Sequence, residues 1–441
     1  TIGEGSHTPR EKTGEGNRRS SALAPFRIEK LVPGGDGYAR LPDGRSVFVP
    51  GALPGDLVRP LEIADKKSFL RVARFELREP GPERVTPACP VAQACGGCDW
   101  MALSHAAQLR NKAALVAEAL ARVGALKLAE PPPIVSAGEA LGYRSRVRLH
   151  IDVRGHVGFF GRGTHELVRL SSCAVVLPEL DAVIGALGSL SQAARAALAR
   201  FEAAELRRAP GEPSVDLELV PRAGEAVDAG ALEELRALLQ GRARVTTAGA
   251  QGPLRRYELP GGAYLEVPPG AFTQVNWPVN AELVTHVLDG AKARSAETFL
   301  DLYSGVGNFS VPLARAGLRG VAVEHNRKAV NALRAGLAAQ KLEVELVAGD
   351  VEASLSRLAR AGRRFDLAVL DPPRAGAKEA IVPLLRLEPR TIAYVACDPV
   401  TLARDARALL AENFDLDAIV CFDMFPQTHH VETLAWFHKR S

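Results

Sequence analysis

The last third of this 441-residue chain alternates apolar runs with amphipathic stretches, and this pattern restricts its fold most. Apolar runs of strand length lie at 298–302, 321–324, 344–347, 367–371 and 392–397. Stretches of helical periodicity between them include 309–316, 327–340 and 401–411. Strands that alternate with helices predict an α/β fold, a doubly wound Rossmann-like parallel sheet. In such sheets the ligand lies beyond the carboxyl ends of the strands.

Reactive or hydrogen-bonding side chains fall repeatedly at these predicted strand ends. They are Asp301, Glu324, Asp350, Asp371 and Cys397. Because the carboxyl ends of parallel strands share one edge of the sheet, we expect these side chains to border a common crevice.

The loop at 301–308 reads Asp-Leu-Tyr-Ser-Gly-Val-Gly-Asn and leads into a predicted helix. Its glycines allow the backbone to approach a ligand closely. Glu324 follows at the spacing, about twenty residues, at which an acid accepts hydrogen bonds from the ribose of an adenosine cofactor. A dinucleotide would favour the fuller Gly-x-Gly-x-x-Gly pattern, and Asp301 would repel its phosphates. The loop, with Glu324 and Asp350, therefore predicts a site for S-adenosylmethionine, which has no phosphate.

Three further residues are candidates for this site: Asp371 to face the cofactor and substrate, and Cys397 and Glu432 for catalysis. Asp371 opens the run Asp-Pro-Pro-Arg-Ala-Gly, whose paired prolines hold the loop outside helical geometry. Cys397 ends the fifth predicted strand and is a candidate nucleophile, although buried cysteines usually behave as inert small hydrophobes. Glu432, in a polar segment near the C-terminus, is a candidate general base. Cys421 lies within an apolar run and is assigned to the core.

Four of the six cysteines are candidates for a metal cluster. Cys89, Cys95 and Cys98 lie within ten residues of one another, and Cys173 follows far downstream. Cysteines that cluster in a chain without an apolar export signal indicate a reducing cytoplasm and metal binding rather than disulfides. Four thiolates also suit zinc, so zinc remains the alternative metal.

The first part of the chain predicts a polar, disordered tail at 1–22 and then a small β-barrel at 23–80. In the barrel, Lys66, Lys67, Arg71 and Arg74 alternate with phenylalanines, which is either an RNA-stacking surface or, as we favour, a solvated face. The next predicted region, 81–265, contains an amphipathic helix at 103–123 that is a candidate to pack on the last domain, 266–441.

Within the middle region, 144–151 has the alternation of a strand. Its alternate positions Arg144, Arg146, Arg148 and His150 would share one face, which indicates either phosphate contacts or an exposed amphipathic strand. Residues 182–240 are rich in alanine and leucine and are predicted to be mostly helical.

The composition excludes few functions. Hydrophobic residues make up 47% of the chain and charged residues 24%, and no apolar run approaches the roughly 20 residues of a membrane span. The net charge of +4 permits an RNA partner without requiring one. We expect a monomeric cytoplasmic protein.

Taken together, these motifs resemble the RNA uracil-5-methyltransferase family, in particular its iron–sulfur 23S rRNA branch. The resemblance rests on the cysteine spacing, Phe-Thr-Gln-Val-Asn at 272–276, Asp-Pro-Pro-Arg-Ala-Gly at 371–376, Cys-Asp-Pro-Val-Thr at 397–401 and His-Val-Glu at 430–432. It implies an OB-like TRAM barrel that binds RNA, a central α+β domain with an iron–sulfur cluster and a C-terminal methyltransferase domain.

The resemblance also implies roles for individual residues. Cys89, Cys95, Cys98 and Cys173 would hold a [4Fe-4S] cluster. The positions that correspond to contacts with S-adenosylmethionine are Gln274, Tyr303, Asn308, Glu324 and Asp371. Cys397 would be the nucleophile that adds to uracil, and Glu432 the base, with His430 two residues before it. The target base would have to leave its stack to reach the thiol.

This chain departs from the family beside the nucleophile, where Ala396 and Asp398 replace the usual Ser or Thr and Asn. An ionised Asp only accepts hydrogen bonds, and its charge is expected to raise the pKa of Cys397. A tRNA uracil or RNA cytosine methyltransferase and a non-catalytic RNA-binding relative therefore remain alternatives.

Overall fold

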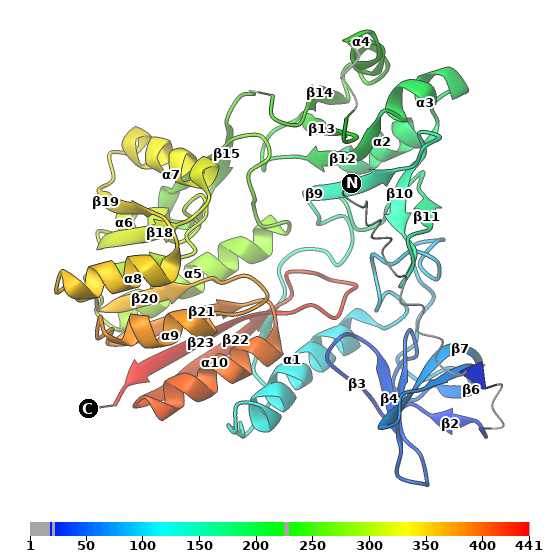
Figure 1. Ribbon diagram of the computed structural model, residues 1–441, viewed down its shortest axis with the longest axis horizontal. Helices are drawn as coiled ribbons and strands as arrows, with labels where there is room; N and C mark the ends of the chain where they lie inside the picture. Colours follow the sequence, from blue (N-terminus) through cyan, green and yellow to red (C-terminus); the bar gives the residue numbers. More distant parts are fainter. Residues whose placement is uncertain (1–17, 20–22, 225–228, 251, 441) are drawn as a thin grey trace, which may run out of the picture. The chain divides into compact units, whose positions relative to one another are not determined.

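The computed structural model describes residues 18–19, 23–224, 229–250 and 252–440 (Figure 1). The chain divides into two units, Thr1–Val85 and Thr86–Ser441. The predicted disordered tail, 1–22, lies outside the described residues except for β1, Arg18–Arg19, which pairs with β6. The predicted domain boundaries at 80/81 and 265/266 stay predictions.

The first unit is an all-β structure, as predicted. Its strands are β2 (Phe26–Arg27), β3 (Lys30–Leu31), β4 (Gly37–Arg40), β5 (Ser46–Val49), β6 (Leu57–Asp65) and β7 (Phe69–Glu79), in the order β1-β6-β7-β5-β4-β3 with β2 also on β6. Valines 47, 49 and 58 are fully buried in its core. Asp56 is also fully buried, and its carboxylate accepts hydrogen bonds from the backbone N–H groups of Leu53 (2.7 Å) and Gly81 (2.8 Å). This carboxylate ties the segment after β7 to the turn before β6.

Two of the four basic residues in the basic stretch of this unit, Arg71 and Arg74, form ion pairs within the unit. Arg71 lies 2.6 Å from Asp36, and Arg74 lies 3.0 Å from Glu62. These ion pairs favour the interpretation of a solvated face over a phosphate-binding one.

The second unit contains a six-stranded sheet of order β11-β10-β9-β12-β13-β14. Its strands are β9 (Arg146–Ile151), β10 (Val157–Phe160), β11 (Leu167–Arg169), β12 (Phe201–Arg207), β13 (Val215–Pro221) and β14 (Ala243–Thr247), with helices α2 (Pro178–Gly188), α3 (Gln192–Leu198) and α4 (Ala229–Leu238). The alternation predicted for β9 is confirmed, since Val147, Leu149 and Ile151 are buried while Arg148 is exposed. Arg144 precedes the strand.

The prediction that 182–240 is mostly helical is wrong. Strands β12 and β13 lie within it, and β12 pairs with β9 over Ala203–Arg207. Alanine favours helices in isolation, so Phe-Glu-Ala-Ala-Glu-Leu-Arg does not have the composition of a strand. Pairing with β9 and burial of one face override that local preference.

The predicted doubly wound sheet is confirmed as an eight-stranded sheet of order β19-β18-β17-β20-β21-β23-β22-β8. Its strands are β8 (Ile134–Val135), β17 (Thr298–Leu302), β18 (Arg319–Glu324), β19 (Val344–Ala348), β20 (Leu367–Leu370), β21 (Thr391–Ala396), β22 (Phe414–Phe422) and β23 (Glu432–Lys439). Strands β17 to β21 pair in parallel, and β23 is antiparallel to both β21 and β22.

Helices cover both faces of this sheet (Figure 1). One face packs on α8 (Val351–Arg360), α9 (Lys378–Leu385) and α10 (Pro399–Ala411). The other packs on α5 (Trp277–Ala293), α6 (Ser310–Arg315), α7 (Arg327–Ala339) and the hairpin of β15 (Arg255–Glu258) and β16 (Tyr264–Val267), which a short turn of 3₁₀ helix, Pro260–Gly262, connects. The central strands β17, β20 and β21 are buried along nearly their whole length, which explains their near-continuous apolar sequences.

Helix α1 (His105–Arg122) lies beside α10, although the two helices are far apart in the sequence (Figure 1). Ser104 caps its first turn by accepting from the N–H of Ala107, a contact worth about 1 kcal/mol. Val116 and Leu120 belong to the same core as α10. Strand β8 follows and pairs with β22, so the segment before the six-stranded sheet contributes to the eight-stranded one.

None of the helices in the described part of the chain combines the length and apolar character that crossing a membrane would require.

Candidate active site

Cys397 and Glu432 are brought together by strand pairing. Cys397 directly follows β21, and Glu432 begins the antiparallel neighbour β23. Ala396 and Thr433 are register partners, so one more step of the ladder puts Cys397 opposite Glu432. Directly opposed residues in antiparallel strands have Cα atoms about 4.5–5.5 Å apart. The predicted nucleophile and the predicted base therefore share one end of the sheet.

A cavity of about 590 Å³ opens at this end of the sheet. It is lined by all but one of the predicted catalytic and cofactor residues, namely Gln274, Tyr303, Asn308, Glu324, Asp371, Cys397 and Glu432. Its volume lies within the range of about 300–1,000 Å³ that is usual for small-molecule sites.

Asp350 is the predicted cofactor residue that does not line this cavity. Its exposed side chain caps α8 by accepting from the N–H of Ala353 (2.9 Å), and this hydrogen bond lowers the pKa of its carboxyl. The strand-end position was read correctly from the sequence, but the capping contact was not anticipated.

The glycine loop is held against Glu324. One carboxylate oxygen of Glu324 accepts from the N–H of Gly305 (2.9 Å) and the other from the N–H of Asn326 (2.6 Å). Each oxygen keeps a further lone pair for a ligand donor. Gly307 has φ +100°, and a Cβ there would lie 2.5 Å from a methyl carbon of Leu333, so this position requires glycine.

Asn308 is fixed by a reciprocal amide pair with Asn280 of α5, with N···O distances of 2.9 and 3.0 Å. The pair holds the end of the glycine loop on α5. Upstream in the loop, burial raises the pKa of Asp301 to about 7, and Ser310 donates a hydrogen bond to its carboxyl.

Burial and like charge raise the pKa values of the central groups. Burial, Glu432 and Asp371 raise the pKa of the Cys397 thiol to about 12. Burial, followed by Asp371, raises the pKa of Glu432 well above its ordinary value, and burial raises the pKa of Asp371 to about 7. Arg374 opposes the shift at Cys397. These raised pKa values favour the protonated forms of all three groups.

Asp398 does raise the pKa of Cys397, as expected, but its effect is smaller than those of burial, Glu432 and Asp371. Its carboxylate caps α10 and accepts from the N–H groups of Val400 and Thr401, both at 2.9 Å. Asn caps helices as well as Asp does, so the departure from the family pattern keeps the local fold.

Sequence reasoning missed several residues of the cavity wall. Arg374 lies 3.4 Å from Nε2 of His430, and its place in the Pro-Pro-Arg run could have indicated it. Arg146, for which the sequence left phosphate contacts and an exposed strand face open, lines the cavity with its guanidinium 5.7 Å from the ring centre of Phe272. Phe272 is 67% exposed, which is unusual for so large an apolar side chain and leaves its ring accessible for stacking.

The four clustered cysteines line a separate cavity of about 160 Å³. Burial, followed by Cys173 and Cys95, raises the pKa of Cys98 to about 12. Asp181 accepts from the N–H of Cys173 (2.6 Å) and fixes the distant cysteine beside the others. Among the described residues, no group of three or more His, Cys, Asp or Glu side chains is arranged to hold a single metal ion.

The chain is similar to known RNA methyltransferases. The family profile of tRNA (Uracil-5-)-methyltransferase matches residues 263–440, and that of the TRAM domain matches residues 26–59. Two curated relatives, from Edwardsiella ictaluri and Chromohalobacter salexigens, are named 23S rRNA (uracil(1939)-C(5))-methyltransferase RlmD. Each is 35% identical; the alignments cover 92% and 96% of this chain, and 93% and 91% of the relatives.

A solved structure supports the fold over nearly the whole chain. The Pyrococcus abyssi tRNA (uracil-54, C5)-methyltransferase, in complex with S-adenosyl-L-homocysteine, matches with a TM-score of 0.74 at 23% identity. The match covers 94% of this chain and all of that one. On the extent and identity of these relatives, the chain belongs to the RNA uracil-C5-methyltransferase family.

Proposed function

We propose that this protein methylates carbon 5 of a uridine in 23S rRNA, with S-adenosylmethionine as the methyl donor. The observation that carries the proposal is that Cys397 and Glu432 lie opposite each other and line a cavity that the glycine loop also lines. The names of the relatives at 35% identity support the substrate.

The chemistry requires both catalytic groups because carbon 5 of uracil is a weak nucleophile. The Cys397 thiolate adds to carbon 6, and the electrons of the 5,6 double bond make carbon 5 enolate-like. S-adenosylmethionine supplies an electrophilic methyl group, which carbon 5 accepts. Glu432 then takes the proton from carbon 5, the double bond reforms and the thiolate leaves. One proton is released in each cycle.

The other residues of the cavity receive positioning roles in this proposal. Glu324 would accept hydrogen bonds from the ribose, and Gln274, Tyr303, Asn308 and Asp371 would border the rest of the cofactor. Asp350 would act from its capping position at the rim. Phe272 and Arg146 offer a stacking ring and a cation for the extruded base and its flanking phosphates.

In this proposal each predicted domain has its own role. Residues 23–80 would bind RNA, 81–265 would hold the cysteine site, and 266–441 would transfer the methyl group. Helix α1 and strand β8 of the middle region nevertheless build part of the catalytic layer.

The test is nucleoside analysis of RNA after incubation with the protein and S-adenosylmethionine. We expect 5-methyluridine in a 23S rRNA fragment and much less in tRNA transcripts. 5-Methylcytidine would instead favour the cytosine alternative. RNA containing 5-fluorouridine should form a covalent adduct, and failure to form any adduct would favour a non-catalytic RNA-binding protein.

We further propose that Cys89, Cys95, Cys98 and Cys173 hold a [4Fe-4S] cluster. A zinc ion draws its thiolates to about 2.3 Å from one point. The four thiols line a cavity of about 160 Å³ together with apolar side chains such as Val91 and Met101, and this space is larger than one ion needs. This volume supports a cluster over zinc. No step of the chemistry above requires a redox change, so its role would be structural.

Anaerobic purification is expected to give a brown protein with iron and sulfide in near-equal amounts. Exposure to oxygen with a chelator should bleach the protein and lower its melting temperature, because the cysteine segments lose their common ligand. Cys98→Ala should reduce the iron content, whereas Cys421→Ala, at a buried position on β22, should not. Stoichiometric zinc without sulfide would contradict the cluster.

A further inference from the structure

The loop that leads into the catalytic base is unusually long. Residues 423–431 join β22 to β23, and Phe422 and Glu432, the residues at its two ends, are register partners. His430 and Glu432 both line the catalytic cavity. Hairpin loops usually have two to five residues, and longer ones tend to vary in conformation. Strand pairing sets the backbone position of Glu432, and the contacts of this loop hold the residues that lead into it.

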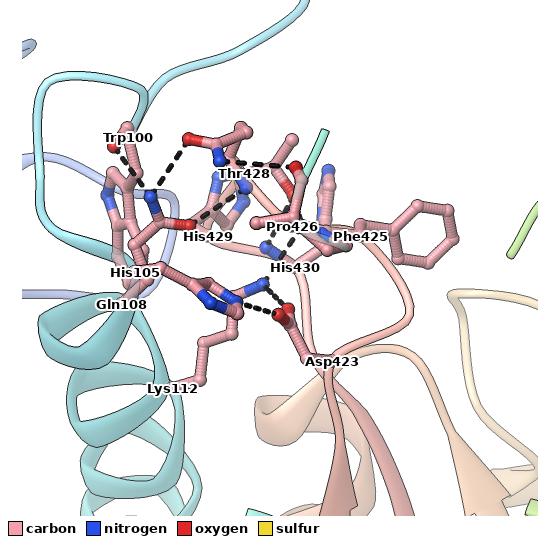
Figure 2. Close-up of polar contacts among 12 residues, drawn as sticks. Trp100, His105, Gln108, Lys112, Asp423, Phe425, Pro426, Thr428, His429 and His430 are labelled. Atoms are coloured by element: carbon pink, nitrogen blue, oxygen red, sulfur yellow. Dashed lines mark hydrogen bonds and ion pairs between the residues drawn. The ribbon is translucent and has the colours of Figure 1, made fainter. Parts of the chain in front are cut away.

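The first part of the loop is held by a fully buried ion pair. Lys112 of α1 and Asp423 have no exposed side-chain surface, and the ammonium of Lys112 contacts the carboxylate of Asp423. The same ammonium donates to the backbone carbonyl of Phe425 (2.9 Å), and Nε2 of His105 lies 2.8 Å from the other carboxylate oxygen (Figure 2). Leaving either buried charge without its partner would cost free energy of folding, so this ion pair holds the start of the loop against α1.

The middle of the loop is held by hydrogen bonds to its backbone. The side-chain oxygen of Gln108 accepts from the N–H of Gln427 (2.8 Å), and the carbonyl of Gln427 accepts from the N–H of Trp100 (3.0 Å). The carbonyl of Pro426 accepts from the hydroxyl of Tyr143 (3.0 Å). Gln427 has φ +70°, a conformation that needs such support in a residue other than glycine.

The last part of the loop is held by Asp99, on the stretch between the third cysteine and α1. Asp99 accepts from the N–H of His429 (3.1 Å), and its second oxygen contacts the imidazole of His429. His430 follows, facing Arg374. Partners of the loop thus run from Asp99 to Lys112, with Tyr143 further on, and Figure 2 shows those on Trp100, His105, Gln108 and Lys112.

We propose that Lys112 and Asp99 are positioning residues for the proton-abstraction step, because they fix the loop that leads into Glu432 and holds His430 beside it in the cavity. This inference rests on the function proposed above. Proton transfer requires the base within hydrogen-bond reach of the proton, and a misplacement of about 1 Å can cost about 100-fold in rate. Methyl transfer itself depends on Cys397 and the cofactor cavity, which the loop contacts leave in place.

The test separates the steps with Lys112→Met and Asp99→Ala. Each variant should lower kcat by about 10- to 100-fold, with KM for RNA and for S-adenosylmethionine within about twofold of wild type. Each should accumulate the same methylated covalent adduct as Glu432→Gln. Asp99→Asn keeps an oxygen for the N–H of His429 and should recover most of the activity.

Controls distinguish this effect from general destabilisation. Arg255→Met breaks the Arg255–Asp216 ion pair, with an Nε···O distance of 2.8 Å, on the hairpin beside the six-stranded sheet and should not accumulate adduct. Iron and sulfide content is measured for the Asp99 variants because Asp99 follows Cys98. If Lys112→Met does not fold, Asp99→Ala, at a position that is partly exposed, carries the test alone.

The outcomes separate the two proposals. Adduct in Glu432→Gln but none in Lys112→Met or Asp99→Ala would overturn the positioning role and leave the proposed function standing. No adduct in any variant, including Glu432→Gln, would overturn the proposed function. Loss of RNA or cofactor affinity without adduct would assign the segment to binding instead and also overturn the positioning role.

Discussion

Replacement of Cys397 by alanine is expected to reduce methylation by about three orders of magnitude or more, the scale of loss when a covalent nucleophile is removed. Without addition at carbon 6, carbon 5 is not activated. Affinity for S-adenosylmethionine should stay within about twofold of wild type, because Glu324 and the glycine loop lie on other strands. Methyl incorporation into a uridine stem-loop and cofactor binding by calorimetry measure the two effects separately.

Cys421→Ala is the matched control for this experiment. Cys421 is a fully buried thiol on β22, so its loss tests the effect of removing a cysteine without removing the nucleophile. It should retain methylation and adduct formation with 5-fluorouridine RNA, whereas Cys397→Ala should lose both. Normal turnover by Cys397→Ala would remove Cys397 from the nucleophile role.

The doubly wound sheet could be predicted because its central strands β17, β20 and β21 are buried on both faces and therefore have nearly uninterrupted apolar sequences. The run at 298–302 was placed at its observed bounds, and the other four strands were placed within two residues at either end. The positions of Asp371 and Cys397 followed directly, since both come at the carboxyl ends of these strands.

The proximity of Cys397 and Glu432 could not be predicted from the pattern, because it depends on an antiparallel strand inserted beside β21. Strand β23 lies between β21 and β22 in the sheet, and nothing in its local sequence specifies that neighbour. The family resemblance indicated both residues, but the register of Ala396 with Thr433 supplies the physical reason for their pairing.

The contacts of α1 were also beyond sequence reasoning. Lys112 reads as one polar residue on an amphipathic helix, yet it is fully buried against Asp423, far away in the sequence. Lysine is rarely buried unless it is paired, so only the tertiary structure reveals its role. Likewise, Asp350 and Asp398 occupy the predicted strand ends, but they cap helices there.

Glu432→Gln is expected to stall the reaction after methyl transfer, with overall turnover reduced by about 100-fold or more. The amide cannot take the proton from carbon 5, so the thiolate cannot leave. The protein should accumulate as a covalent complex with RNA, which denaturing gels detect as a shifted band. Mass spectrometry of the complex should show that the added nucleotide already carries the methyl group.

Glu379→Gln is the control, since this exposed carboxylate on α9 lies outside the cavity. It should turn over normally and form no lasting adduct with natural uridine. An adduct in both variants would indicate a general effect of charge loss rather than loss of the base.

The pH dependence provides an independent test of the same role. Glu432 acts as a base only when ionised, and burial with the neighbouring Asp371 raises its pKa above the ordinary value. The wild-type release step should therefore slow as pH falls through this raised pKa, at a higher pH than for an exposed glutamate. The residual release by Glu432→Gln should lack that dependence. If Glu432→Gln instead turned over freely and kept the wild-type pH profile, the proton would have to go to another carboxylate of the cavity, and Asp371 would be the first to test.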